Sequence, residues 1–138
     1  MAAPGKAHGF TLIELLIAIA VVGILTALAV ASYDFAMVKT RRGAAKACLT
    51  EGAQAMERRY TLTFSYEDAT LPGCSDEVSD HYTVGFAAAE PTATTFRIEA
   101  VPKGSQAASD TTCGTLSIDN TGVRLAGDGS SAAVDACW

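Results

Sequence analysis

An unbroken apolar segment near the N-terminus constrains this chain more than any other feature. The segment covers residues 10–33, a run of 24 residues in which Glu14 is the only charged side chain. A helix of this length extends roughly 36 Å, whereas the hydrocarbon core of a bilayer is about 30 Å thick. A chain of 138 residues is too small to enclose a helix that is apolar on all sides. We therefore predict a membrane-spanning helix over residues 10–33.

A secretory signal peptide would also place an apolar stretch near the N-terminus. Such a signal has a basic start, an apolar stretch of about 7 to 15 residues and a small-residue cleavage site. Here the polar sequence MAAPGKAHG precedes the segment, and no clean cleavage signal follows it near Ala31. Charge counting alone would leave the C-terminal part in the cytoplasm, because more basic residues follow the segment than precede it.

Glu14 is a carboxylate inside the predicted span. A charge in this position is costly unless it is neutralised, reaches the interface or finds a partner. The residue alone allows two interpretations: a functional pairing, or a glutamate at the helix start that favours the helix dipole and snorkels to water.

The string Gly9-Phe10-Thr11-Leu12-Ile13-Glu14 resembles the N-terminal signature of type IV pilins and of type II secretion pseudopilins. The resemblance implies that a prepilin peptidase removes residues 1–9 as a leader by cutting between Gly9 and Phe10, and that Phe10 becomes N-methylated. It also places the domain after the span, residues 34–138, outside the cytoplasm. The chain would thus be a single-pass inner-membrane protein with a periplasmic head, and later part of an extracellular pilus.

The same resemblance suggests a partner for Glu14, namely the N-terminal amine of a neighbouring subunit. Two opposite charges in apolar surroundings reward pairing and penalise a wrong stagger, so Glu14 is expected to set the assembly register. Many pilins carry a proline near the position of Ala31, and this chain has none there. Gly23 is the intrinsic weak point of the span, at about 1 kcal/mol relative to alanine. We expect a continuous helix, straighter than in relatives that contain the proline.

The helix is predicted to continue over residues 34–60, because apolar residues recur there at three-, four- and seven-residue spacings. The members of this stripe are Phe35, Val38, Ala45, Leu49, Ala53, Met56 and Tyr60. Lys39, Arg41 and Arg42 form a basic cluster just beyond the span. This cluster is expected either to contact anionic lipid head groups or acidic neighbours, or to form a solvated helix face.

Residues 61–80 lack firm periodicity and are predicted to be a connecting loop. Alternating apolar residues then predict three antiparallel strands near residues 82–86, 96–100 and 116–118, with a short fourth at 123–125 as an option. Turn residues occupy 89–93, 102–110 and 119–122. The predicted fold class is α+β: a long N-terminal helix packed on an antiparallel sheet of three to four strands, within residues 81–138, as in type IV pilins.

The four cysteines favour two disulfides in an extracytoplasmic domain, with three possible connectivities. We prefer Cys48 with Cys74, which would tie the connecting loop to the helix, and Cys113 with Cys137, which would hold the C-terminal end to the sheet. Each bridge closes a loop of about 25 residues and contributes roughly 3 kcal/mol. A zinc site is disfavoured because the sequence contains no CxxC pair.

Two further strings narrow the resemblance to PilE-type minor pilins. Residues 113–122, CGTLSIDNTG, together with the terminal Cys137-Trp138, resemble the C-terminal region of those proteins. Residues 56–61, MERRYT, resemble the end of their long helix.

Catalysis and ligand binding find little support in the residues. His81 is the only histidine that remains after processing, and we expect it at the surface at the start of a strand. The sequence contains no recognisable cofactor, metal or nucleophile motif. Residues 61–138 hold three basic groups and eleven acidic ones, which disfavours direct DNA binding. Calcium could be held by Asp119, Asp128 and Asp135, but their spacing is irregular, and solvated loop carboxylates are the better interpretation.

The sequence therefore predicts a structural subunit of a type IV pilus, a minor pilin processed by prepilin peptidase. Its expected partners are other pilin subunits, the inner membrane before assembly and the pilus assembly machinery. A type II secretion pseudopilin is the alternative, and a DNA- or surface-binding pilin comes third.

Overall fold

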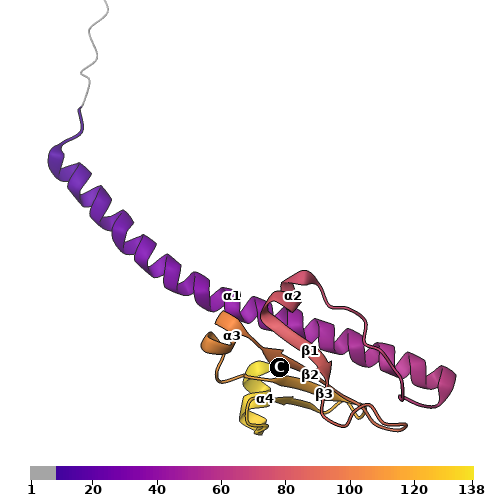
Figure 1. The fold of residues 1–138 in the computed structure, drawn as a ribbon. Helices are drawn as coiled ribbons and strands as arrows, with labels where there is room; N and C mark the ends of the chain where they lie inside the picture. Colours follow the sequence, from indigo (N-terminus) through magenta and orange to yellow (C-terminus); the bar gives the residue numbers. More distant parts are fainter. Residues whose placement is uncertain (1–8) are drawn as a thin grey trace, which may run out of the picture. The chain divides into compact units, whose positions relative to one another are not determined.

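The computed structural model describes residues 9–138; residues 1–8, most of the predicted leader, lie outside the described part. The chain divides into two compact units, the first ending at Ala36 and the second covering Met37–Trp138. One long helix, α1 (Leu12–Thr63), belongs to both units. The remaining elements all lie in the second unit: α2 (Asp76–His81), β1 (Tyr82–Phe86), β2 (Arg97–Pro102), α3 (Gly104–Ser109), β3 (Leu116–Asp119), β4 (Arg124–Ala126) and α4 (Ser131–Cys137) (Figure 1).

The first unit is the start of α1 and little else. The helix begins at Leu12, two residues after the predicted start of the span, and continues through the rest of the apolar segment without a break, as expected for a stretch that contains no proline. Gly23 lies inside this helix with open space around it.

The sheet of the second unit is an antiparallel meander in the order β1-β2-β3-β4. Its register pairs Tyr82 with Pro102 at one edge and Ile98 with Ile118 at the centre. Because side chains alternate between the faces of a strand, Ile98, Ala100 and Leu116 all reach the buried face. The α+β class and the antiparallel sheet are confirmed, and the optional fourth strand is present one residue later than predicted.

The core of this unit lies between the sheet and α1. Helix residues Ala45, Leu49 and Met56 are fully buried, as the predicted apolar stripe requires. Gly52 lies where the helix approaches the sheet most closely, since a Cβ added there would meet the Cδ1 of Ile98 at 3.2 Å. The helix and the sheet therefore share one apolar interior.

Several boundaries differ from the sequence prediction. Helix α1 ends at Thr63 rather than at residue 60, and the predicted loop contains α2. The predicted turn 102–110 contains α3, and the residues after the last predicted strand, expected to be a C-terminal loop, contain α4. His81 is the last residue of α2 and half-buried, rather than an exposed residue at the start of a strand. These short helices were missed because each buries only one side chain, which leaves no periodic signal: Val78, Gln106 and Cys137 respectively.

Candidate functional site

A side-chain hydrogen bond caps the start of α1. The hydroxyl of Thr11, the residue before the helix, accepts a hydrogen bond from the backbone N–H of Glu14 at 3.3 Å. This is half of the reciprocal arrangement in which a threonine and a glutamate three residues later satisfy free N–H groups of a first turn. Glu14 is exposed and lies in the first turn, where the helix dipole favours a negative charge. Gly9 and Phe10 precede the helix and are exposed.

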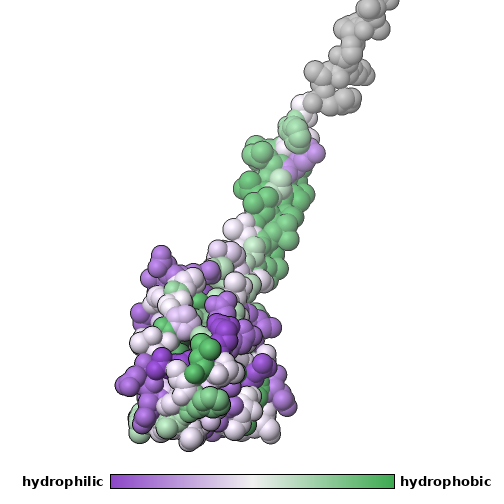
Figure 2. Space-filling view, turned by 90° about the vertical axis from the view of Figure 1, so that its right-hand side faces the viewer, coloured by the Kyte–Doolittle hydropathy of each residue, from purple (hydrophilic) through white to green (hydrophobic). Residues whose placement is uncertain are grey.

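The side chains of the apolar segment are not buried by other residues of the described chain. Within the described residues, α1 is the one helix long and apolar enough to cross a membrane, and none of its most apolar 18-residue window is buried. Figure 2 shows this segment as hydrophobic surface. Uncovered apolar surface of this extent requires a lipid or protein partner, because soluble proteins rarely expose patches of such size.

The head is braced by two disulfides that use all four cysteines. Cys48 on α1 bonds to Cys74 in the segment before α2, and Cys113 before β3 bonds to Cys137 at the end of α4. These are the two pairs preferred from the sequence. The first attaches the 64–75 connection to α1, and the second attaches α4 to the rest of the head.

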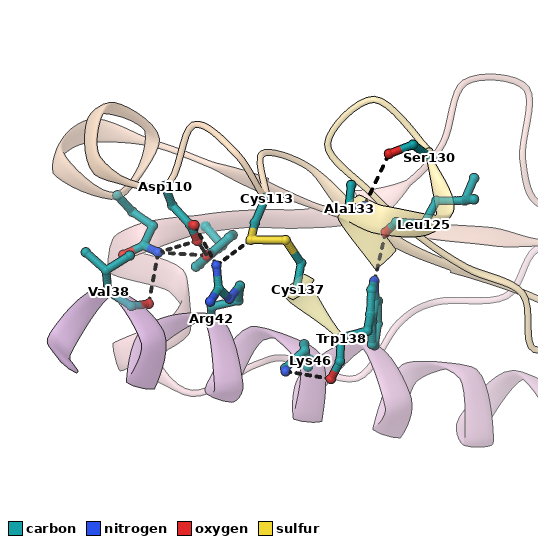
Figure 3. The surroundings of a disulfide bond; sticks show 12 residues. Val38, Arg42, Lys46, Asp110, Cys113, Leu125, Ser130, Ala133, Cys137 and Trp138 are labelled. Carbon is teal, nitrogen blue, oxygen red and sulfur yellow. Dashed lines mark hydrogen bonds and ion pairs between the residues drawn. A yellow bond between two sulfur atoms is a disulfide. The ribbon is translucent and has the colours of Figure 1, made fainter. Parts of the chain in front are cut away.

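A buried polar cluster consists of Arg42, Tyr82, Gln106 and Asp110. Figure 3 shows Arg42 and Asp110 beside the second disulfide. Arg42 reaches from α1 and donates from Nη1 to Oδ1 of Asp110 at 2.7 Å and to Sγ of Cys113. Gln106 Nε2 lies 2.9 Å from Tyr82 Oη and 3.1 Å from Asp110 Oδ2. Burial, with the neighbouring Asp110 carboxylate, raises the pKa of Tyr82 to about 12.

The polar cluster and a second contact attach α1 to elements far along the chain. Gln106 Nε2 also donates to the carbonyl of Val38 at 3.2 Å. Lys46 Nζ donates to the carbonyl of Trp138 at 3.0 Å, and burial lowers the pKa of this lysine. The indole N–H of Trp138 in turn donates to Leu125 O at 2.8 Å. Residues 38–46 of α1 are thus held by α3, by the loop that follows it and by the C-terminal residue.

Comparison with protein families gives two matches, one mainly to the head and one to the N-terminal segment. Residues 31–117 match the family model described as "Type IV minor pilin ComP, DNA uptake sequence receptor". Residues 5–30 match a second model, described as a prokaryotic N-terminal methylation motif. The chain belongs to the ComP family of type IV minor pilins.

Two solved structures share the pilin fold. A type IV pilin from Shewanella oneidensis is 31% identical, with a TM-score of 0.54, over 73% of this chain and 97% of that one. The non-core minor pilin PilV from Neisseria meningitidis is 19% identical, with a TM-score of 0.53, over 69% of this chain and 90% of that one. The second likeness concerns the fold alone. No curated protein sequence matches the chain. The pilin family and fold are those of structural proteins and not of enzymes.

The position of Arg42 in this pilin corrects one interpretation of the basic cluster at residues 39–42. Arg42 is buried in an ion pair and therefore takes no part in a solvated or lipid-facing surface. The sequence carried a signal for this position. The predicted apolar stripe jumps seven residues from Val38 to Ala45, and Arg42 lies in that gap, four residues after one and three before the other.

Of the acidic residues considered for calcium, Asp119 and Asp128 accept hydrogen bonds within turns, and Asp135 lies in α4. Among residues 9–138, no three histidine, cysteine or acidic side chains converge on a common point. Although partial burial opposes the shift, hydrogen bonds from Thr121 and Val123 lower the pKa of Asp119. Asp128 accepts from the N–H of Ser130 at 2.9 Å, which lowers its pKa.

A groove of about 520 Å³ opens between α1 and the turn that joins β3 to β4. The buried side chains of Phe96 and Ile118 form its floor with Ala53, and polar residues such as Gln54, Arg58 and Thr121 form its rim. The sequence offered no sign of this groove, because its lining comes from three separate segments.

Proposed function

We propose that this chain is a minor pilin that is processed by prepilin peptidase and then assembles into, or primes, a type IV pilus. The observation that carries the proposal is the exposed apolar surface of α1, which begins three residues after Gly9 and lies largely within the residues that match a methylation motif. The solved structure at 31% identity is that of a type IV pilin, which supports a pilus over the alternative, a secretion pseudopilus.

Processing would occur between Gly9 and Phe10, and Phe10 would receive the methyl group. Both residues precede the helix and are exposed, so a peptidase can bind them in an extended conformation without unwinding α1. Before assembly, the span would lie in the inner membrane with the head in the periplasm. Extraction into the filament would then replace lipid by the helices of other pilin subunits around the same surface.

Glu14 would set the stagger between subunits by pairing with the N-terminal amine of a neighbour. Its position in the first turn keeps the carboxylate within a few residues of its own N-terminus, so equivalent groups of two adjacent helices meet when the helices are shifted by about one turn. In apolar surroundings an unpaired carboxylate is strongly disfavoured, so this pair selects one stagger more than it adds net stability.

Two variants test the processing and register roles separately. Gly9→Leu should leave the longer precursor in the membrane, whereas Gly23→Leu, in open space within the same helix, should be processed normally. Glu14→Ala should be processed but largely absent from sheared filaments, whereas Glu51→Ala, an exposed acidic position later on α1, should assemble. Processing of Gly9→Leu would refute the leader assignment, and normal assembly of Glu14→Ala would refute the register role.

DNA capture is the second candidate function, and the description of the matched family favours it. The charge of the head opposes it, because several cations are already engaged by protein groups. Arg42 pairs with Asp110, Arg97 lies 3.7 Å from Asp119, and the Arg124 guanidinium lies 5.1 Å from the centre of the Trp138 ring. Binding of the full chain to labelled duplex DNA over a salt series distinguishes the cases. Tight binding that weakens steeply with salt would establish DNA capture.

A further inference from the structure

The two disulfides of the head differ in their access to solvent. Cys74 is partly exposed, whereas its partner Cys48 is 8% exposed. In the other bridge both residues are buried, with Cys113 3% and Cys137 1% exposed. A disulfide is opened by a thiolate that attacks one of its two sulfur atoms, so the rate depends on whether that atom can be reached. Of the four cysteines, Cys74 is therefore the one at which such an attack can begin.

A cavity lies directly beside Cys74. It has a volume of about 280 Å³ and opens between β1, α2 and the connection that precedes α2. Its lining consists of residues 71–74 of the connection, Ser79 of α2, and Tyr82 and Val84 of β1. This space is large enough for a small thiol, which can therefore approach Cys74 while the elements around it keep their positions.

The second bridge has a favourable leaving group but no exposed sulfur to attack. Arg42 donates a hydrogen bond to Sγ of Cys113, and a cation in this position would help Cys113 to leave as a thiolate. Cys113 leaves only if the incoming thiolate attacks Cys137, which is buried at the end of α4. The next residue, Trp138, is held by the hydrogen bond from its indole to Leu125 O. Access therefore decides the order in which the two bridges open.

The segment that the first bridge attaches to α1 has few other ties. Figure 1 shows the connection running back from the end of α1 to α2. Among residues 9–138, no backbone hydrogen bond includes a residue from 70 to 74. Leu71 lies close to α1, since a Cβ added at Gly52 would meet its Cδ2 at 3.5 Å. Once the disulfide is open, this segment can leave α1 at the loss of a few apolar contacts, which is the usual form of local opening.

The rest of the head does not depend on the first bridge. The sheet and the buried stripe of α1 form the core, and none of the other ties of the head involves residues 70–74. These ties are the Arg42–Asp110 ion pair, the hydrogen bond from Lys46 to Trp138 O and the Cys113–Cys137 disulfide. Opening of the first bridge should therefore free the connection and leave the folded core in place.

We propose that the Cys48–Cys74 bridge is a thiol–disulfide exchange site, which a dithiol opens through Cys74 while the rest of the head stays folded. One thiolate of the dithiol attacks Cys74 Sγ and forms a mixed disulfide, and Cys48 leaves as a thiolate that takes up a proton. The second thiolate then attacks the sulfur of the dithiol in that mixed disulfide, and Cys74 leaves and is protonated. The dithiol ends as a disulfide, so two electrons and two protons have passed to the bridge.

Partial reduction of the processed full chain in mild detergent tests this order. Dithiothreitol is added at about pH 8, where thiolates form readily, and new thiols are blocked with N-ethylmaleimide at intervals. The remaining bridges are then reduced in urea and blocked with iodoacetamide. The first bridge should acquire maleimide about tenfold or more faster than the second, because the second requires a larger opening. Mass spectrometry resolves the four cysteines, since trypsin places them in four peptides: residues 47–58, 60–97, 104–124 and 125–138.

Two further measurements test the route through the cavity. Gly73→Leu should slow reduction of the first bridge several-fold, because Gly73 lines the cavity beside the attacked sulfur. Gly43→Leu is the matched control and should leave the rate unchanged, since a Cβ added at either glycine has nothing within 4 Å but Gly43 lies on α1 away from this lining. With the monothiol 2-mercaptoethanol and an acid quench, the mixed disulfide should be found on residues 60–97, which contain Cys74.

Each readout can overturn the proposal. Equal rates for the two bridges in the folded chain, or earlier reduction of the second, would refute the order. A mixed disulfide on Cys48, or an unchanged rate in Gly73→Leu, would refute the attack at Cys74 through the cavity. The native fluorescence of Trp138 should persist after the first bridge opens, and its loss would show that the head unfolds instead. Filament incorporation plays no part in these measurements, so their failure would leave the pilus proposal intact.

Discussion

Arg42 is the most informative residue for testing the interior of the head. The side chains of Arg42 and Asp110 are 11% and 5% exposed, and Nη1 of the arginine lies 2.7 Å from Oδ1 of the aspartate. In Arg42→Met the Asp110 carboxylate keeps its contacts with Gln106 and Tyr82 but loses its only partner of opposite charge in the cluster. Breaking a buried pair in this way costs about 3–5 kcal/mol, a large part of the roughly 5–15 kcal/mol that stabilises a domain.

The assay is urea unfolding of the processed full chain in mild detergent, followed by the fluorescence of Trp138, the single tryptophan. Arg42→Met should lower the free energy of unfolding by about 3 kcal/mol or more, and Arg58→Met, at an exposed position on the same helix, by about 0.5 kcal/mol or less. The double variant Arg42→Met/Asp110→Leu should be more stable than Arg42→Met alone, because it removes the uncompensated charge. Additive losses in the double variant, or a loss below about 1 kcal/mol in Arg42→Met, would refute this account of the cluster.

Two other predictions concern the same domain. Burial raises the pKa of Tyr66 and Tyr82 to about 12. The contribution of these two phenols to stability should therefore be complete below about pH 10 and decline between pH 10 and 12, by at most about 1.4 kcal/mol per pH unit for each phenol. Tyr82→Phe should weaken this decline in urea titrations across that range, and an unchanged decline would contradict the assignment. Gly127→Ala should destabilise more than Gly129→Ala in the same assay: both positions have positive φ, but only at Gly127 would the new Cβ meet a backbone oxygen, Thr112 O, at 2.5 Å. Equal losses would show that the backbone near Thr112 yields.

The elements that could be predicted from the sequence are those whose side chains repeat. The long helix was predictable because its apolar segment and its stripe at Leu49 and Met56 continue over many turns, and the strands because their side chains alternate. A six-residue helix such as α3 shows no such repetition. It depends on tertiary contacts, in particular those of its one buried residue, Gln106, with Val38 and Tyr82.

The polar cluster could not be predicted in full, because the residues that bond to one another lie far apart in the chain. Arg42 and Asp110 are separated by 68 positions, and Asp110 looked like one of many acidic residues in turns. The gap in the apolar stripe marks Arg42 as a residue that faces the core, but it does not identify its partner. Only the meander and α3 bring the carboxylate to the helix.

The two units obtain their stability from different sources, which decides how variants in each should behave. In the head, the Cys48–Cys74 disulfide and the buried Arg42 attach α1 to loops of the same chain, and the Cys113–Cys137 disulfide attaches α4. In the apolar segment, the described side chains from Leu12 to Val30 are all exposed, so their stabilisation has to come from lipid or from other subunits. Glu14→Ala should therefore reduce assembly and leave the urea unfolding of the head unchanged. Arg42→Met should destabilise the head against urea and leave assembly unchanged as long as the head stays folded. If Glu14→Ala destabilised the head to the same extent as it reduced assembly, this separation of roles would be wrong, and the loss of filaments could no longer be attributed to the register.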